Sequence, residues 1–415
     1  MGCCDVKGLM PIDLALTKMQ AELTNVCQSI TLPLSQALGA VLAQDILSPL
    51  NVPPFNNSAM DGYALSHADL NICSCEQPIV LKEVGCALAG SPYIGDIPRG
   101  CCVRIMTGAV LPTGVDTVVM QEQVSVSEEQ LTFTRSPKFG DNVRLVGEDV
   151  MFEQRVLKQG HRLTPRDIPL LASLGLETLQ VFRKLKVAVL SSGDELKSLG
   201  EPLNTGELYD SNRYSMIALL SRLNVEVIDL GIIKDDKSAL KEAFIKADQQ
   251  ADVVISSGGV SVGEADFIKA VLAELGTISF WKLAIKPGKP FAFGHLPNSV
   301  FFGLPGNPVS ALVTLYQLAV PAMEKLSGMA VKSAMRFTAI MQDDIRKKAG
   351  RTDFQRGLYF VDKAEQIVVQ STGKQGSGIF SSMCQSNCFI VLEQDRGNVM
   401  AGERVTIEPY THLLD

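Results

Sequence analysis

Lysines, acids and glycine-rich turns are concentrated in three short stretches between residues 251 and 312. Residues 256–263 follow a β-branched run, residues 282–290 place three lysines around a Pro-Gly turn, and residues 304–308 separate an apolar strand from a long apolar helix. In a parallel α/β sheet such turns emerge at the carboxyl edge, where backbone N–H groups and helix N-termini favour anions. The pattern predicts a site for a phosphate-like anion together with a metal ion.

Four acidic residues occur at turns, three of them near the ends of predicted strands. They are Asp149, Glu195, Asp235 and Asp266. Clusters of hard oxygen ligands at a sheet edge suit Mg²⁺ that bridges substrate phosphates. Each acid taken alone is more often a helix cap or a solvated turn residue, but the group of acids around the lysines favours a site.

Other chemistries are disfavoured by spacing. Residues 259–263 match the G-x-S-x-G nucleophile elbow, but four residues separate the strand from Ser261 and no feature nominates His295 or His412 as its partner. No P-loop occurs, so phosphate binding must use the Gly-Gly and Pro-Gly turns. The ten cysteines include no Cys-x-x-Cys pair, and no histidine is spaced to complete a zinc site.

The bulk composition indicates a multidomain globular protein, with 415 residues and 46% hydrophobic content. The net charge of −7 argues against general nucleic-acid binding, which usually needs a basic face. No run approaches the roughly 18 apolar residues that span a bilayer, and no secretion signal begins the sequence. We expect a cytoplasmic protein without a membrane or nucleic-acid partner.

The order of patterns predicts an α/β plus β architecture in four domains. Alternating strands and helices over 183–331 predict a doubly wound α/β domain. Short β-type runs over 51–146 and 332–415 predict two small β-domains. Helical patterns over 1–50 and 147–182 predict a discontinuous domain of helical or mixed character. Within that domain we expect helices near residues 13–23, 35–42 and 165–175.

Six motifs, taken in order, resemble those of the molybdopterin molybdenumtransferase family, which includes the E domain of gephyrin. The resemblance covers nearly the whole chain. The motifs are Met-Asp-Gly-Tyr-Ala at 60–64, Arg-Ile-Met-Thr-Gly-Ala at 104–109, Arg-Leu-Val-Gly-Glu-Asp at 144–149, the run from 256 to 266, Lys-Pro-Gly-Lys-Pro at 286–290 and Leu-Pro-Gly-Asn-Pro at 304–308.

The resemblance implies a four-domain homodimer that uses Mg²⁺ to insert molybdate into adenylylated molybdopterin, releasing AMP. Other proteins of molybdenum cofactor biosynthesis are expected partners. The chemistry is compatible, because charge neutralisation and positioning suffice for such a transfer without an acid–base histidine. A non-catalytic pterin-binding scaffold is the alternative, since gephyrin-like chains also act in anchoring.

Matching the family motifs residue by residue assigns roles to positions of this chain. The catalytic positions are Asp61, Thr107, Asp149, Glu195, Lys282 and Lys286. The cofactor-binding positions are Ser257, Gly258, Gly259, Lys289, Pro305, Pro308, Ser310, Arg356 and Ser377. The metal ligands are Asp235, Asp266 and Glu195. Because Arg356 and Ser377 lie in the terminal domain, we expect them to complete the site of a two-fold partner instead of their own.

Overall fold

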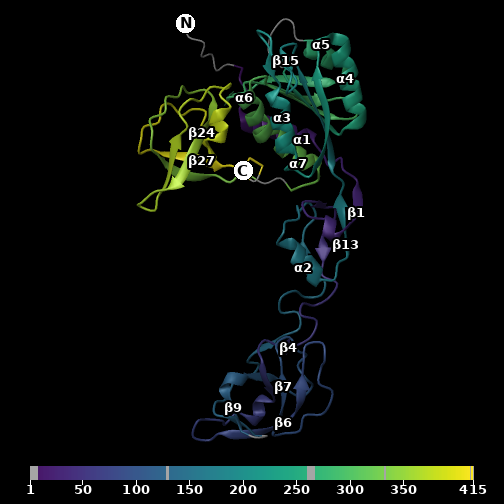
Figure 1. The fold of residues 1–415 in the computed structure, drawn as a ribbon, viewed down its shortest axis with the longest axis vertical. Helices are drawn as coiled ribbons and strands as arrows, with labels where there is room; N and C mark the ends of the chain where they lie inside the picture. Colours follow the sequence, from purple (N-terminus) through teal and green to yellow (C-terminus); the bar gives the residue numbers. More distant parts are fainter. Residues whose placement is uncertain (1–7, 128–129, 259–266, 331–332, 412, 415) are drawn as a thin grey trace. The chain divides into compact units, whose positions relative to one another are not determined.

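The computed structural model describes residues 8–127, 130–258, 267–330, 333–411, 413 and 414 (Figure 1). Contacts between Cα atoms divide the chain into two compact units. Unit 1 comprises residues 1–43, 160–164 and 179–415, and unit 2 comprises residues 44–159 and 165–178. The predicted division into four domains is finer than this and stays a prediction.

The centre of unit 1 is a six-stranded mixed sheet with the order β17-β14-β18-β22-β21-β19. The first four strands run parallel to one another. Strand β21 pairs antiparallel with both of its neighbours, β22 and β19. Their bounds are β14 Leu185–Ser192, β17 Val225–Ile233, β18 Val253–Ser257, β19 Thr277–Lys282, β21 Pro290–His295 and β22 Val300–Leu304. The sequence pattern predicts all of these strands except β21.

Helices cover both faces of this sheet, which confirms the doubly wound fold (Figure 1). Because side chains alternate along a strand, Val187 and Val189 of β14 face one core while Ala188 and Leu190 face the other. The helices on the first face are α1 Ile12–Glu22, α3 Ser211–Leu220, α6 Pro308–Thr314 and α7 Val320–Leu326. Those on the second face are α4 Lys237–Gln250 and α5 Phe267–Leu275.

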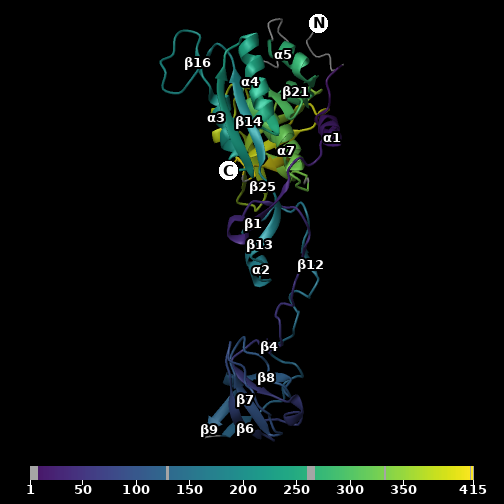
Figure 2. The same ribbon diagram turned by 90° about the vertical axis from the view of Figure 1, so that its right-hand side faces the viewer.

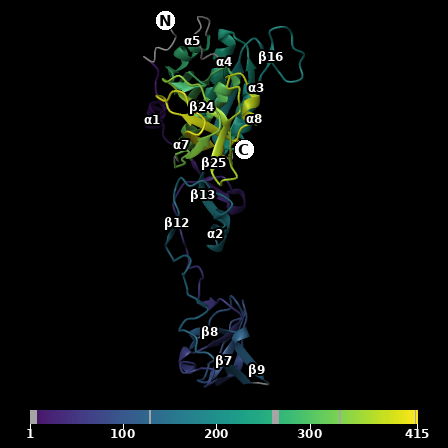
Figure 3. The same cartoon turned by 90° about the vertical axis from the view of Figure 1, so that its left-hand side faces the viewer.

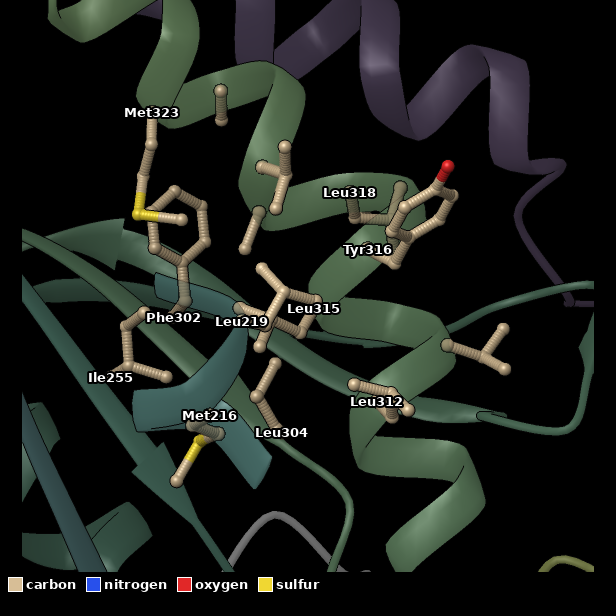
Figure 4. Close-up of a cluster of buried hydrophobic side chains, with 14 of the residues drawn as sticks. Met216, Leu219, Ile255, Phe302, Leu304, Leu312, Leu315, Tyr316, Leu318 and Met323 are labelled. Carbon is tan, nitrogen blue, oxygen red and sulfur yellow. The ribbon is translucent and has the colours of Figure 1, made fainter. Parts of the chain in front are cut away.

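A continuous helical stretch from Pro308 to Leu326 forms much of the first core (Figure 4). Its middle part, η4 Leu315–Ala319, is a π-helix between α6 and α7. Pro321 lies in the first turn of α7 and lacks an N–H, so the α-helical hydrogen bond to the residue four positions earlier cannot form there. Leu315 of η4 and Phe302 of the sheet strand β22 both belong to this core (Figure 4).

The C-terminal domain is a small closed barrel that belongs to the same unit. Its strands follow the order β20-β24-β25-β23-β27-β26, and β24 also pairs with β26, which closes the ring. Phe354 and Phe389 of the barrel belong to the same buried core as α6. The elements are β20 Ile285–Lys286, β23 Phe337–Met341, β24 Thr352–Val361, β25 Ile367–Ser371, α8 Ser381–Cys384, β26 Cys388–Leu392 and β27 Arg404–Pro409.

The helix expected over residues 35–42 is wrong. The structure has only the short 3₁₀-helix η1 Leu34–Gln36, followed by the strand β2 Val41–Leu42. This strand pairs with β13 Thr178–Phe182, which also pairs with β1 Ser29–Pro33. Pairing with a segment far along the chain therefore overrides the local helical spacing, which is a weak determinant in so short a segment.

Unit 2 contains the first small β-domain, a six-stranded sheet with the order β8-β5-β7-β6-β10-β9. Outside the sheet, the unit also contains two short strand pairs, two 3₁₀ turns and the predicted helix α2 Asp167–Ser173. The sheet strands are β5 Gly62–Leu65, β6 Ile79–Ala87, β7 Cys101–Ile105, β8 Thr117–Met120, β9 Val124–Ser127 and β10 Gln130–Phe133. The pairs are β3 Ile46–Leu47 with β12 Arg155–Leu157, and β4 Asn57–Ser58 with β11 Val143–Arg144. Two 3₁₀ turns are η2 His67–Asp69 and η3 Gln121–Gln123.

Across the described residues, no helix combines the length and the apolar character that a membrane crossing requires.

Candidate functional site

A cleft of about 810 Å³ lies at the carboxyl edge of the parallel strands in unit 1. It includes the ends of β14 and β18, between which the chain switches from one side of the sheet to the other. Open α/β sheets bind ligands at this position. Nine of the predicted site residues line the cleft: Glu195, Asp235, Gly258, Lys286, Lys289, Pro305, Pro308, Ser310 and Ser377.

The acidic side of the cleft comes from the loops after β14 and β17. Glu195 and Asp235 both line it, and both are exposed to solvent. The hydroxyl of Ser192, at the end of β14, donates a hydrogen bond of 2.6 Å to Asp235 Oδ1. The backbone N–H of Asp235 donates to Asp194 Oδ1 at 3.2 Å. These bonds hold the carboxylate of Asp235 at the sheet edge, and its Oδ2 can bind a ligand.

The turn after β18 requires glycine at the one position that the structure describes. Gly258 has a φ of +94°, and a Cβ there would lie 2.6 Å from the backbone oxygen of Ser192. Its N–H donates to the oxygen of Leu304 at 3.2 Å, so the turns after β18 and β22 are joined. A side chain at this position would clash with backbone that cannot move aside.

The basic side of the cleft comes from the turn that follows β20 and from the C-terminal barrel. Lys286 Nζ donates to Asp353 Oδ2 at 3.0 Å, and this carboxylate is almost fully buried. Gln355 also donates to Asp353, at 3.1 Å. Lys289 is exposed, and Arg351 adds a third cation to the lining. Three cations at one wall can neutralise an oxyanion.

The C-terminal barrel reaches the sheet edge of its own chain. The backbone N–H of Val309, in the first turn of α6, donates to the oxygen of Ser377 at 3.0 Å. Gln375 and Gly376 line the same cleft. We expected that the terminal domain would not reach the sheet edge of its own chain and would instead complete the site of a partner. The contact of Ser377 with Val309 shows that the first part of this expectation is wrong. A core shared with α6 holds the barrel in place.

Arg356 supports the cleft from behind. Its side chain is fully buried and is not among the lining residues. Nε donates to the hydroxyl of Ser382 at 3.0 Å, and the guanidinium also donates to the backbone oxygens of Phe354 and Gly376. Burial lowers the pKa of Arg356, an effect that the charges of Tyr410 and Asp353 partly oppose. Its geometry favours a positioning role for the loop that carries Ser377 over direct contact with a ligand.

Asn212 lines the cleft and joins helix α3 to the end of β18 and to the turn after β22. It lies in the first turn of α3, and its Nδ2 donates to Ser257 Oγ at 2.7 Å and to the oxygen of Gly306 at 2.8 Å. Both of its donor positions are therefore used on the turns after β18 and β22. The amide fixes the spacing between the turn that carries Gly258 and the turn that carries Pro305.

Three predicted site residues belong to unit 2. Asp61 Oδ1 accepts from the backbone N–H of Thr107 at 2.7 Å and from its hydroxyl at 2.8 Å, so the structure brings these two residues together. Those bonds, and to a lesser extent the charge of Arg104, lower the pKa of Asp61. Asp149 is exposed in the same unit. Asp61 is thus held as a carboxylate that remains exposed to solvent.

We expect Thr107→Val to raise the pKa of Asp61 toward its ordinary value. The substitution removes the hydroxyl donor and keeps the backbone donor, so the rise is partial. Carboxyl ¹³C chemical shifts of labelled Asp61, followed against pH, measure the change. Thr107→Ser, which retains a hydroxyl, serves as the control. Equal pKa values in the two variants would contradict the role of the hydroxyl.

Four predicted positions lie elsewhere. Lys282 is exposed and does not line the cleft, and Ser257 is buried beneath it as the partner of Asn212. Gly259 and Asp266 lie outside the described residues. Within the residues that the structure describes, no three side chains of His, Cys, Asp or Glu gather into a metal-binding group. The metal assignment thus depends on Glu195 and Asp235.

Comparison with known proteins adds family matches over most of the chain. Residues 10–175 match the MoeA N-terminal region (domains I and II), residues 188–325 a probable molybdopterin binding domain, and residues 338–410 the MoeA C-terminal region (domain IV). A molybdopterin molybdenumtransferase from Haemophilus influenzae is 52% identical over 98% of this chain and 100% of its own length. The chain belongs to the molybdopterin molybdenumtransferase (MoeA) family.

Two further relatives extend the MoeA-family comparison. A crystal structure of a molybdopterin biosynthesis MoeA protein from Pyrococcus horikoshii has a TM-score of 0.85 at 30% identity, covering 97% of this chain and 100% of that one. A gephyrin from Dictyostelium discoideum is 30% identical over 96% of this chain and 62% of its own length. The MoeA-like multidomain fold expected from the sequence is confirmed.

Several cleft residues are not identified by the sequence motifs. Arg351, Asn212 and Tyr209 line the cleft, and Asp353 holds Lys286. Asp210-Ser211-Asn212 has the composition of a helix start, and Asp210 indeed caps α3 by accepting from the N–H of Arg213. That signal predicts a helix boundary but does not indicate that the first turn faces a ligand.

Proposed function

We propose that this MoeA-family chain is a molybdopterin molybdenumtransferase that inserts molybdate into adenylylated molybdopterin and releases AMP. The observation that carries the proposal is the division of charge in one cleft. Lys286, Lys289 and Arg351 line it together with the acids Glu195 and Asp235. Two relatives that bear this enzyme name are 52% and 35% identical to the chain, over 100% and 86% of their own lengths.

The lining residues fit the chemistry of this transfer. Molybdate and the anhydride phosphates are oxyanions, and Lys286, Lys289 and Arg351 supply cations that balance their charge. Ser310 and Ser377 add hydroxyls at the same wall. Attack of water on the phosphoanhydride releases AMP. The two dithiolene thiols replace one oxygen of molybdate, and that oxygen leaves with their two protons as water. The residues orient the two reactants, and orientation accounts for much of catalysis in such transfers.

The acidic side of the cleft fits Mg²⁺. Proteins usually bind this ion through one or two carboxylates together with substrate phosphates. Glu195 and Asp235 provide two hard-oxygen donors, and Ser192 orients the second of them. When bound there, Mg²⁺ supplies charge neutralisation at the phosphoanhydride. Asp266 remains the predicted third acidic residue.

The remaining partners are proposals that rest on the family. A homodimer, other proteins of molybdenum cofactor biosynthesis and a cytoplasmic location all fit such an enzyme. Asp61, Thr107 and Asp149 of unit 2 are proposed to act in the same reaction, with the carboxylate of Asp61 held ionised by Thr107.

The decisive experiment measures AMP released from adenylylated molybdopterin by the purified chain, with and without molybdate and Mg²⁺. The enzyme should release AMP only when both are present. Glu195→Gln and Asp235→Asn should each raise the Mg²⁺ concentration needed for half-maximal release. A pterin-binding scaffold would bind the substrate without releasing AMP, so binding without turnover would favour that alternative.

A further inference from the structure

The cleft is much larger than a tetrahedral oxyanion requires. Its volume of about 810 Å³ falls in the range of about 300–1,000 Å³ that holds ligands of drug size. Cations and acids account for only part of the lining. Leu208 and Tyr209 line the cleft as well, and both are large side chains that remain exposed.

Tyr209 is the last residue of the short strand β16, which belongs to a segment that projects from the α/β domain (Figures 2 and 3). We call this segment, residues 196–209, the ribbon. The ribbon pairs β15 Leu196–Lys197 with β16 Leu208–Tyr209. Although its ring lines a cleft, 41% of Tyr209 is accessible to solvent. Its hydroxyl donates to the backbone oxygen of Glu201 at 2.8 Å. The polar end of the ring is therefore satisfied within the ribbon.

The ribbon itself is well held. The N–H of Leu208 donates to the oxygen of Glu195 at 2.8 Å, and the N–H of Asp210 donates to the oxygen of Lys197 at 3.1 Å. Lys197 and Glu207 form an ion pair at 3.3 Å. Tyr209 thus follows Leu208, which bonds to the backbone of the predicted metal ligand Glu195, and precedes Asp210, which caps α3. A ring whose hydroxyl is bonded to Glu201, and whose chain neighbours are held by backbone bonds, can stack on a ligand at low cost in conformational entropy.

We propose that the ring of Tyr209 is a stacking platform for a flat heteroaromatic ring of the substrate, and that it contributes to specificity. The inference rests on the proposed function, because adenylylated molybdopterin carries two such rings, adenine and the pyrimidine ring of its pterin. The shared chemistry is a planar ring with a π-face, which stacks on aromatic side chains without regard to its exact hydrogen-bonding pattern. The phosphates would then extend from Tyr209 toward the lysines.

Direct binding tests the platform independently of turnover. AMP and pterin-6-carboxylate are titrated separately into the full chain by calorimetry, using wild type, Tyr209→Leu and Tyr209→Phe. We expect Tyr209→Leu to weaken one of the two ligands about tenfold, which also identifies the stacked ring. Tyr209→Phe retains the ring and should stay within about threefold of wild type. Tyr214→Leu is the matched control, since Tyr214 is similarly exposed but lines a different pocket.

Steady-state kinetics give the second measurement. Tyr209→Leu should raise KM for adenylylated molybdopterin about tenfold and leave KM for molybdate within twofold. If wild type releases no AMP in response to molybdate, the proposed function fails, and the titrations still decide the platform.

Three results would overturn the platform. The first is the absence of measurable binding of both AMP and pterin-6-carboxylate to wild type. The second is equal binding of both by wild type and Tyr209→Leu. The third is a change of oligomeric state in Tyr209→Leu by sedimentation, which would assign the exposed ring to contact with a second copy.

Discussion

Lys286→Met is expected to reduce kcat/KM for molybdate by about 100-fold or more. Removing one preorganised donor from an oxyanion site typically costs that much in rate. Its ammonium lines the cleft and is held by the buried carboxylate of Asp353 at 3.0 Å. The loss should appear as a higher requirement for molybdate in assays of AMP release. An unchanged dependence of rate on molybdate would contradict the role of Lys286.

The same substitution also affects stability, because it leaves Asp353 with Gln355 as its remaining side-chain partner. Lys286 is half-exposed, so water replaces part of the lost interaction, and we expect a cost of only about 1 kcal/mol. The double variant Lys286→Met/Asp353→Asn should recover the melting temperature without recovering activity. Lys246→Met, an exposed lysine on α4, is the matched control and should change neither quantity.

Arg356→Met is expected to lower the free energy of unfolding by about 2 kcal/mol and kcat/KM for molybdate about tenfold. The substitution removes the guanidinium N–H groups that donate to Ser382 Oγ and to the backbone oxygens of Phe354 and Gly376. Hydrogen bonds to a charged group contribute about 1.5–3 kcal/mol each, and relief of the buried charge offsets part of their loss. Thermal melts and the kinetics of AMP release measure the two effects.

A positioning role makes a prediction that a purely structural role does not. Amide hydrogen exchange should accelerate over residues 375–379, the loop that Arg356 holds, before it accelerates in β24. Arg356→Lys should rescue neither stability nor kcat/KM, because a lysine cannot reproduce the planar fork of donors. Arg346→Met, an exposed arginine of the same barrel, is the control. Activity equal to wild type in Arg356→Met would contradict the positioning role.

The sequence predicts those parts of the fold in which local pattern and burial agree. The strands β14, β18 and β22 are short apolar runs that end at glycine or small residues, and the structure has them where the pattern indicates. The local pattern predicts a helix where strand β2 lies, because its partner β13 is more than 130 residues away and leaves no local signal. Long-range pairing of this kind cannot be deduced from periodicity.

The candidate site divides in the same way. Turn motifs identify Gly258 and Lys286 because their backbone requirements and charges are local features of the sequence, whereas Ser377 is assigned only through the family resemblance. Asp353 and Arg351 lack such a signal, since their relevance arises only when β24 pairs with β20 and brings the barrel to the cleft. The motif match predicts that Arg356 contacts the anion, but the structure buries this side chain outside the cleft lining. A motif match therefore does not reveal which way a side chain points.

The core shared by the barrel and α6 has a consequence for protein engineering. Phe354 and Phe389 are buried in one apolar cluster with Tyr316 and Leu312 of the helical stretch. A chain truncated before residue 332 would expose that surface and would also lose Gln375, Gly376 and Ser377 from the cleft. Neither part can be exchanged by domain grafting without redesigning the other. Selection for solubility of this unit therefore also preserves the geometry of its anion site.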